Sequence, residues 1–216
     1  MTTGELLELF RVEMNDVPKP QLWSDDFIFG AMDSAQTWFT RWTDGIPDST
    51  TPAVTDLAVL AGTGEYPLHK AVLKLRTARR ADNGRPVEVC NEEDLATQNR
   101  YFDNVPGVLR ALVMGMDEST VRTWPLPMED TPVKLSVFRL PLVRITDDQA
   151  FEIAEQHHRE LLLWMKHLAY SVQDAETFDR TKAADFESRF KDYCFKVKLE
   201  QGRLRHKPRS VQYGGL

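Results

Sequence analysis

The segment LWSDDFIFGAMDSAQTWFTRW, residues 22–42, decides the fold, because its apolar side chains recur at intervals of three and four residues. This spacing places them on one side of a helix. Ser24, followed by Asp25 and Asp26, supplies an N-cap and first-turn acids. The sequence therefore predicts a helix that starts after Ser24 and buries one apolar stripe. The predicted stripe contains Ile28, Ala31, Met32, Ala35, Trp38, Phe39 and Trp42.

Three further aromatic residues, Trp23, Phe27 and Phe29, fall partly outside this stripe. Surplus aromatic side chains suit contact with a neighbouring molecule, since they bury a large area and have few rotamers. We therefore predict that these three residues bind a partner. The alternative, in which all three belong to the core, is equally compatible with the sequence.

A shorter helix is predicted over residues 2–15, before the aromatic segment. Thr2 and Glu5 have the spacing of a capping box, and leucines and Phe10 supply an apolar side. The following stretch VPKPQ, residues 17–21, contains two prolines, which end the helix.

The period changes after a loop that the sequence predicts at 44–56. Residues 54–142 contain short apolar or alternating segments separated by Gly, Pro, Asp and Asn, which is typical of five or six antiparallel strands. Asn83 and Gly84 have the composition of a hairpin turn. Residues 91–99 are predicted to form one or two helical turns.

Helical periodicity returns after Pro141. Thr146 and Gln149 are spaced as a second capping box, which predicts a helix over 150–172. Asp174 is predicted to cap a last helix that reaches about Glu200 and stops at Gly202.

These elements predict an α+β fold: a four-helix bundle with an antiparallel β domain inserted between its second and third helices, and an extended C-terminal arm. The predicted boundaries are 1–45 for the first two helices, 54–142 for the β domain, 146–201 for the last two helices and 202–216 for the arm.

Composition excludes several classes of protein. No apolar run of the 216-residue chain is long enough to span a membrane, and the acidic start MTTGELLELF does not resemble a signal peptide. The net charge of −6 argues against nonspecific coating of DNA. The charge is uneven, because residues 202–216 carry +4 without an acid and leave −10 on the rest.

A search for catalytic, cofactor-binding or metal-binding residues predicts none. Glu155 and His158 have the Glu-x-x-His spacing of di-iron bundles, but the second copy is missing, so we expect His157 and His158 to be solvated or at an interface. Cys90 and Cys194 fall in predicted strand and helix stripes and are expected to be buried structural thiols, with a reducing compartment as the simpler setting. GTGEY, residues 62–66, lacks the Gly-Lys-Ser/Thr of a phosphate loop and is expected to be a turn.

KLRTARR, residues 74–80, is the densest basic run before the arm. On a strand, Lys74, Arg76 and residues two apart would share one face. This face could bind nucleic acid, but no aromatic interleaving or reading motif accompanies it. A solvated face or a subunit contact is the preferred interpretation.

The order of features resembles the head–tail connector, or adaptor, proteins of tailed bacteriophages, the group that includes the tail tubular protein A type. The resemblance rests on LWSDDFIFGAMDSAQ at 22–36, on GEYPLHKAVLKLRTARR with GRPVEV at 64–89, and on residues 140–193. The last stretch contains His158, Leu161 and Trp164 in a His-x-x-Leu-x-x-Trp pattern similar to that of the family.

This resemblance implies a structural protein of the virion, without catalysis or cofactor, made in the host bacterial cytoplasm. Such proteins form a ring, usually of twelve copies, beneath the portal protein at the head–tail junction. The ring extends the channel through which DNA passes without specific binding, and it carries the tail (nozzle or tail tube) protein. No membrane is involved.

The arm 202–216 is the predicted partner-binding segment, docking on the portal or an adjacent copy. It is too polar and glycine-rich to fold alone. Its predicted contacts are the cations Arg203, Arg205, Lys207 and Arg209 and the strand-addition anchors Val211, Tyr213 and Leu216. A disordered tail is the alternative. Two other functions remain open: a nucleic-acid-binding phage accessory protein that uses 74–80 and the arm, and, less favoured, a metal-dependent bundle enzyme.

Overall fold

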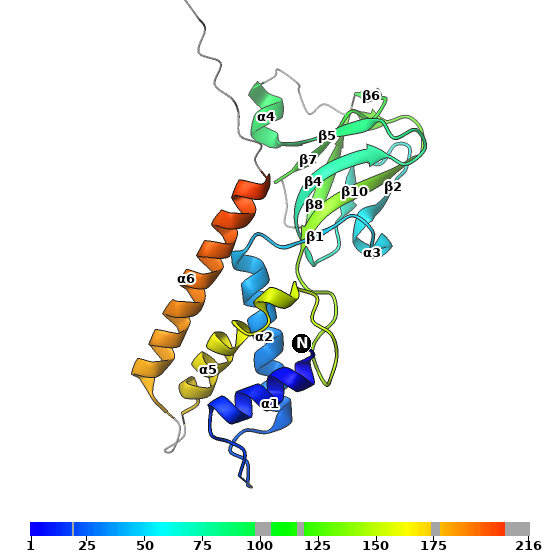
Figure 1. Ribbon diagram of the computed structural model, residues 1–216. Helices are drawn as coiled ribbons and strands as arrows, with labels where there is room; N and C mark the ends of the chain where they lie inside the picture. Colours follow the sequence, from blue (N-terminus) through cyan, green and yellow to red (C-terminus); the bar gives the residue numbers. More distant parts are fainter. Residues whose placement is uncertain (19, 98–104, 116–118, 174–177, 206–216) are drawn as a thin grey trace, which may run out of the picture. The chain divides into compact units, whose positions relative to one another are not determined.

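The computed structural model describes residues 1–18, 20–97, 105–115, 119–173 and 178–205. The chain divides into two compact units, a helical unit of Met1–Asp44 with Val143–Leu216 and a β unit of Gly45–Leu142 (Figure 1). The described residues form six α-helices and a curled, mainly antiparallel sheet, so the predicted α+β class is confirmed.

The helical unit contains α1 (Thr3–Glu13), α2 (Asp25–Trp42), α5 (Leu161–Ser171) and α6 (Arg180–Arg205). Both predicted N-terminal caps are confirmed. The Thr2 hydroxyl accepts the Glu5 amide while the Glu5 carboxylate accepts the Thr2 amide, and Ser24 Oγ accepts the Phe27 amide at 3.2 Å. Local sequence therefore determines where the first two helices start.

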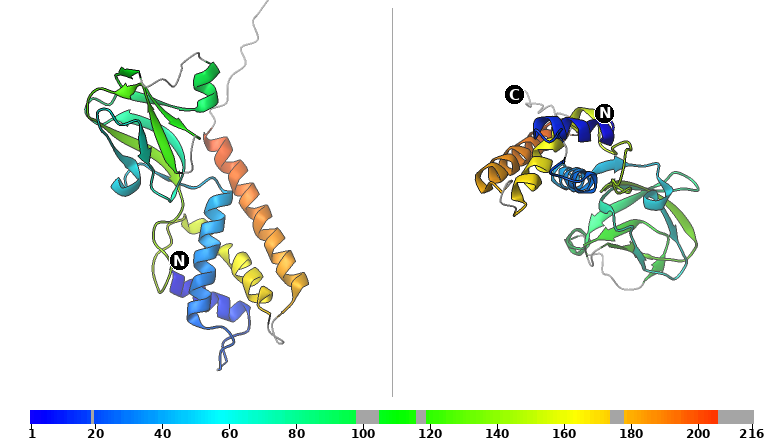
Figure 2. Two further views of the ribbon diagram at one scale, coloured as in Figure 1. Left: turned by 180° about the vertical axis from the view of Figure 1, so that it is seen from behind. Right: turned by 90° about the horizontal axis from the view of Figure 1, so that it is seen from below.

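The apolar stripe of α2 packs against α5 and α6. Ile28, Met32 and Ala35 have no exposed surface, and the Trp42 and Trp164 rings meet at 5.5 Å. Phe190 of α6 completes this aromatic core at 5.4 Å from Trp164. Figures 1 and 2 show α1 crossing α2 instead of running beside it, so the four predicted helices do not form a regular four-helix bundle.

A buried ion-pair cluster fixes the corner between α1 and α2. The Arg11 guanidinium donates to Asp16 Oδ2 at 2.6 Å, to the Trp23 carbonyl at 3.2 Å and to Asp25. Asp16 also accepts the Leu22 amide at 2.6 Å. Because Arg11 and Asp16 are both buried, each neutralises a charge that would be costly alone.

The predicted helix over 150–172 is wrong in its first half. A single 3₁₀ turn, Glu155–His157, precedes α5, which begins only at Leu161. One of the two acids expected in the first turn of this helix, Asp148, instead caps α1, because its Oδ1 accepts the Gly4 amide at 2.8 Å. The Gln149 amide donates to Thr3 Oγ1 at 2.7 Å. The segment that was predicted to start a helix therefore binds the start of α1, through the Asp148 side chain and the backbone of its neighbours.

The last helix also differs from the prediction. The expected cap Asp174 lies outside the described residues, whereas the Asp179 carboxylate accepts the amides of Thr181 and Lys182 at the start of α6. At its other end α6 continues through Gly202 to Arg205, so the predicted stop and the start of the arm at 202 are wrong. A single glycine costs only about 1 kcal/mol in a helix, and the residues after it favour helix.

The β unit consists of short strands arranged in the order β1-β10-β4-β5-β7-β8-β3, with β2 also paired to β10. Most pairs are antiparallel as predicted, but β5–β7 and the small pair β6–β9 are parallel. The strands are β1 (Ile46–Asp48), β2 (Asp56–Val59), β3 (Glu65–Pro67), β4 (Val72–Arg80), β5 (Pro86–Asn91), β6 (Pro106–Gly107), β7 (Ala111–Met114), β8 (Thr120–Trp124), β9 (Leu126–Pro127) and β10 (Thr131–Arg139).

Two short helices complete this unit. α3 (Pro52–Thr55) lies, like β1, in the segment 44–56 that was predicted to be a loop. Pro52 stands at the start of α3, where a backbone N–H would have no helical partner, so proline loses no hydrogen bond there. The helical turns predicted after β5 are confirmed as α4 (Glu92–Thr97). The Asn83–Gly84 turn is confirmed by the β4–β5 hairpin, in which Gly84 has φ +68°.

Alternation along the strands separates two apolar clusters. Leu112 of β7 faces the main core with Leu75, Val121 and Leu135. Its neighbour Val113 points to the other face, where it joins Cys90, Leu95 of α4 and Ala111. Successive side chains of β7 therefore alternate between the two clusters, as a strand predicts, and both faces of β7 are buried.

Asp48 and Arg139 join the strands at which the chain enters and leaves the β unit. Arg139 Nε donates to Asp48 Oδ2 at 2.6 Å, and both side chains are buried. Burial raises the pKa of Asp48, but the Arg139 bond and the Thr50 and Thr51 amides outweigh it, so the pKa lies well below the ordinary value. The Asp48 carboxylate therefore stays charged, and its ion pair with Arg139 links β1 to β10.

Candidate interaction surfaces

An aromatic surface made of Trp38, Trp42 and Phe195 lies on the helical unit. The rings of Trp38 and Trp42 meet at 5.3 Å, and Trp42 lines a groove with Phe195 of α6. Trp38 is 39% exposed and Phe195 is 61% exposed. Exposed aromatic groups of this kind mark protein contacts. Sequence analysis assigned Trp38 and Trp42 to the core and missed Phe195, which lies outside the buried stripe of α6.

Lysines border this aromatic surface, and acids of the same unit neutralise them. Lys191 Nζ lies 5.6 Å from the Trp42 ring centroid and 2.5 Å from Glu187. Lys198 pairs with Asp44 at 2.8 Å. The aromatic surface is therefore mainly apolar, and the charges of Lys191 and Lys198 at its rim are neutralised by ion pairs.

The aromatic residues predicted to bind a partner occupy different environments. Trp23 is 8% exposed and packs edge-on against Phe10 at 5.8 Å, which favours the core alternative for this residue. Phe27 and Phe29 are half-buried on the first turns of α2 and keep some accessible surface.

The predicted arm is described only at its beginning. Arg203 is exposed on the last turn of α6, and Arg205 ends the helix. Lys207, Arg209, Val211, Tyr213 and Leu216 lie outside the described residues.

The basic run 74–80 forms most of β4, but its outward face differs from the prediction. Arg76 is an extra residue in the β4–β10 register, so Leu75 and Ala78 both point inward and Arg79 joins Lys74 and Arg76 on the exposed side. Sequence alone cannot locate such a bulge. The expected alternation from Arg76 to residues 78 and 80 is therefore wrong.

Arg80 lies apart from the exposed cations of β4. It pairs with Asp82 at 2.9 Å and with Glu129 at 3.1 Å. Within the described ranges, Lys74, Arg76 and Arg79 have no ion pair.

His157 and His158 were expected to be solvated or at an interface; the solvated alternative is wrong, because both rings are buried. His157 Nδ1 lies 2.8 Å from the Tyr193 hydroxyl, and the nitrogens of His158 each lie 3.0 Å from a carbonyl oxygen, of Met1 and of Ile153. Burial, and then the neighbouring His158, lower the pKa of His157, which favours its neutral form. Burial raises the pKa of Tyr193 to about 12. These rings hold the 153–160 segment on the helices, and the described residues contain no group of three metal ligands.

Both cysteines are buried, as predicted. Burial raises the pKa of the Cys194 thiol to about 12, so the nucleophilic thiolate is disfavoured. Cys90 packs under α4 in the second cluster of the β unit.

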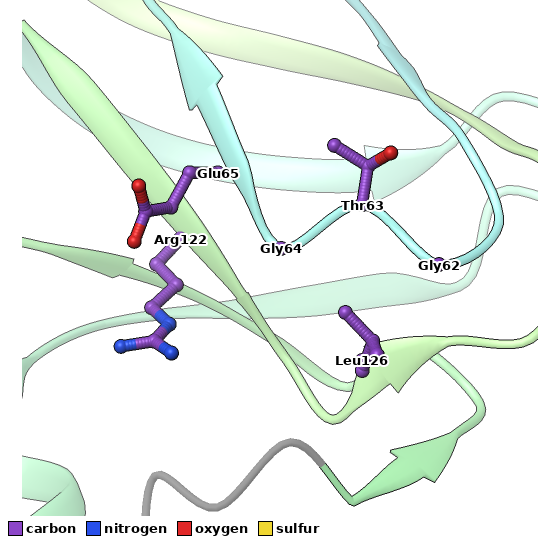
Figure 3. A pocket seen from close by; sticks show the side chains of 6 residues that line it. All are labelled: Gly62, Thr63, Gly64, Glu65, Arg122 and Leu126. Carbon is purple, nitrogen blue, oxygen red and sulfur yellow. The ribbon is translucent and has the colours of Figure 1, made fainter.

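Residues 62–64 of the GTGEY segment lie in the turn that joins β2 to β3, as predicted, and Glu65 and Tyr66 begin β3. Its Tyr66 hydroxyl accepts the Leu60 amide at 2.8 Å and donates to carbonyls of the turn, which fixes the backbone. A shallow pocket lies beside it, and Figure 3 shows the side chains of Glu65 and Arg122 at its edge, with Leu126 opposite the two glycines. Glu65 and Arg122 are opposite each other on the paired strands β3 and β8, and the described residues that line the pocket include no lysine to bind a phosphate.

A search of the described helices finds none with the length and apolar character needed to cross a membrane. No curated protein matches the chain. A family model described as SU10 adaptor protein matches residues 1–210. That match covers both units, and it agrees with surfaces suited to protein contact; the chain accordingly belongs to the SU10 adaptor protein family and is a structural adaptor of a bacteriophage.

Proposed function

We propose that this adaptor forms a ring of twelve copies under the portal, extends the DNA channel and carries the tail (nozzle or tail tube) protein. The observation that carries the proposal is the match of an adaptor family model to residues 1–210. The finer resemblance to the tail tubular protein A type, and the position at the head–tail junction of the virion, belong to the same proposal.

A closed ring repeats a head-to-tail contact, which requires two different complementary surfaces on each copy. The aromatic surface of Trp38, Trp42 and Phe195 supplies one candidate, because Trp38 and Phe195 are exposed and the groove beside them is mainly apolar. Phe27 and Phe29 at the start of α2 supply a second.

The C-terminal segment is proposed to reach another molecule, either the portal or an adjacent adaptor. The eleven residues 206–216 extend to about 36 Å at 3.3 Å per residue. Val211, Tyr213 and Leu216 would anchor it, and its cations would pair with acids of the partner. Leu204 is 88% exposed on the last helical turn and extends this apolar set.

The charge distribution supports a role around DNA without binding it. Residues 1–201 carry a net charge of −10. An acidic channel wall repels phosphate and lets DNA slide.

Co-sedimentation of the purified chain with the portal protein of its phage tests the proposal. We expect the wild type to sediment with the portal, the truncation of 206–216 to lose most of this binding, and W38A/F195A, at the exposed aromatic residues, to prevent closure into a ring. M128A, at a 68% exposed residue of the β unit, is the control and should behave as wild type. Wild-type protein that stays apart from the portal would overturn the proposal, whereas unchanged binding after truncation would remove only the role of the arm.

A nucleic-acid-binding accessory protein is the second candidate. The exposed cations Lys74, Arg76 and Arg79, which have no ion pair in the described part of the chain, favour it. Duplex DNA binding by the isolated chain that weakens steeply with salt would support this alternative over the adaptor ring.

A further inference from the structure

Strands β4 and β5 start as a hairpin and then separate. They pair at Ala78↔Val87 and Arg79↔Pro86, after which β5 pairs with β7 in parallel over Glu88 to Asn91. Residues 72–77 of β4 keep β10 on one side and have no strand among the described residues on the other. Backbone N–H and C=O groups at such an opening can pair with an added strand.

A groove of about 440 Å³ lies at this opening. Lys74 and Arg76 line it from β4, Val89 and Asn91 from β5, and Met114 from β7. We call it the β4–β5 groove. Its volume falls within the roughly 300–1,000 Å³ of ligand sites, and its lining combines apolar side chains with two cations.

The charges of the β4–β5 groove are unbalanced. Lys74 and Arg76 are exposed and form no ion pair with the rest of the described chain. Asp94 also lines the groove, but its carboxylate accepts the Asn91 amide at 3.2 Å at the start of α4. Lys74 and Arg76 therefore have no anionic partner in the described chain, and a bound segment with acidic side chains could supply one.

We propose that the β4–β5 groove binds an extended segment of a partner protein in which acidic and apolar side chains alternate. Side chains of a strand point alternately to opposite faces, so one set can meet Lys74 and Arg76 while the other packs on Val89 and Met114. The backbone of the segment pairs with the open edge of β4. This site does not depend on ring formation.

Two other occupants fit less well. The C-terminal segment of this chain carries cations and no acid, so Lys74 and Arg76 repel it. Duplex DNA would be repelled by the Asp94 carboxylate in the groove and cannot form hydrogen bonds with a strand edge.

Fluorescence anisotropy with full-length protein tests the proposal. The probe is a fluorescein-labelled peptide of sequence Thr-Val-Glu-Val-Glu-Val-Glu-Thr. We expect saturable binding to wild type that weakens by roughly tenfold or more in K74E/R76E. The control K70E/R85E changes the charge equally at exposed residues outside the groove and should stay within about twofold.

A second peptide separates strand addition from charge attraction. The same sequence with N-methyl groups on alternate amides should bind roughly tenfold more weakly or not at all, because it cannot form the strand hydrogen bonds. Hydrogen exchange should slow at 72–77 when the unmodified peptide binds. K74Q/R76Q repeats the test in case charge reversal prevents folding.

Four results would overturn the proposal. Failure of the wild type to bind the peptide would leave Lys74 and Arg76 only a role in protecting a strand edge from aggregation. Equal binding of the methylated peptide would exclude strand addition, and equal loss in K70E/R85E would exclude the groove. Displacement of the peptide by a 20-base-pair duplex that itself binds more tightly would assign the cations to phosphate instead.

Discussion

At the scale of single residues, short polar side chains and buried charges differ in how well sequence predicts them. Thr2 and Ser24 cap the helices that they precede, because a cap bonds to amides two or three residues away. The ion pair of Asp48 with Arg139 joins positions 91 residues apart, so no local pattern indicates it. The same holds for the cluster around Arg11.

We expect Asp48→Asn to destabilise the β unit by about 3–5 kcal/mol at pH 7, because it leaves Arg139 buried without its counter-ion. The pKa of Asp48 is lowered in the folded state, so its stabilising effect is complete well above its ordinary value of 3.8 and is lost as the pH falls toward the folded pKa. The difference between wild type and variant should therefore narrow below about pH 4. Hydrogen exchange of the β10 amides at several pH values measures this difference in stability between wild type and Asp48→Asn.

The exposed Glu65→Gln variant is the control for this experiment and should leave β10 exchange unchanged. A difference between wild type and Asp48→Asn that stays constant from pH 7 to pH 3 would contradict the assigned role of the charged carboxylate.

The Cys194 thiol should resist alkylation in the folded protein, since burial both covers it and raises its pKa to about 12. In a Cys90→Ala background, iodoacetamide at pH 8 should label Cys194 only as fast as the helical unit opens, and at once in urea. Labelling at the rate of a small free thiol without denaturant would show that the site is open.

At the scale of helices and strands, periodicity predicts type better than boundaries. Helix α2 and the strand-rich middle of the chain follow from spacing alone. The helix predicted at 150–160 is absent because Asp148 caps α1, and sequence does not reveal which amide an acid will serve. The bulge at Arg76 likewise depends on the partner strand β10.

Asp148→Ala should weaken the start of α1, whereas Asp147→Ala should have little effect because α1 uses the backbone carbonyl of Asp147. The amide of Gly4 should exchange faster in the first variant. If Asp148 instead capped its own following segment, exchange would change at 150–153 and Gly4 would stay protected.

Replacing each of two glycines by alanine should change the stability of the folded protein in opposite directions. Gly202 lies within α6 with no atom within 4 Å of an added Cβ, so Gly202→Ala should stabilise by about 0.5–1 kcal/mol. Gly84 has φ +68° in the β4–β5 turn, and Gly84→Ala should destabilise by about 1 kcal/mol. Urea denaturation measures both, and a loss of stability in Gly202→Ala would contradict the continuous helix.

At the scale of the whole molecule, sequence predicts the α+β class and the order of helices, strands and helices, and its resemblance to phage adaptors agrees with the family match. The packing of α1 across α2 could not be predicted, because it depends on the Arg11 cluster. Of the predicted contact residues, Trp23 lies in the core, while Phe195 was missed because an exposed apolar residue leaves no periodic signal.

Electron microscopy of the chain mixed with its portal protein tests the adaptor role most directly. We expect a ring of adaptor density on one end of the portal, with the symmetry of the portal and an open central channel. Portal particles without added density, at concentrations that saturate any specific contact, would contradict the account.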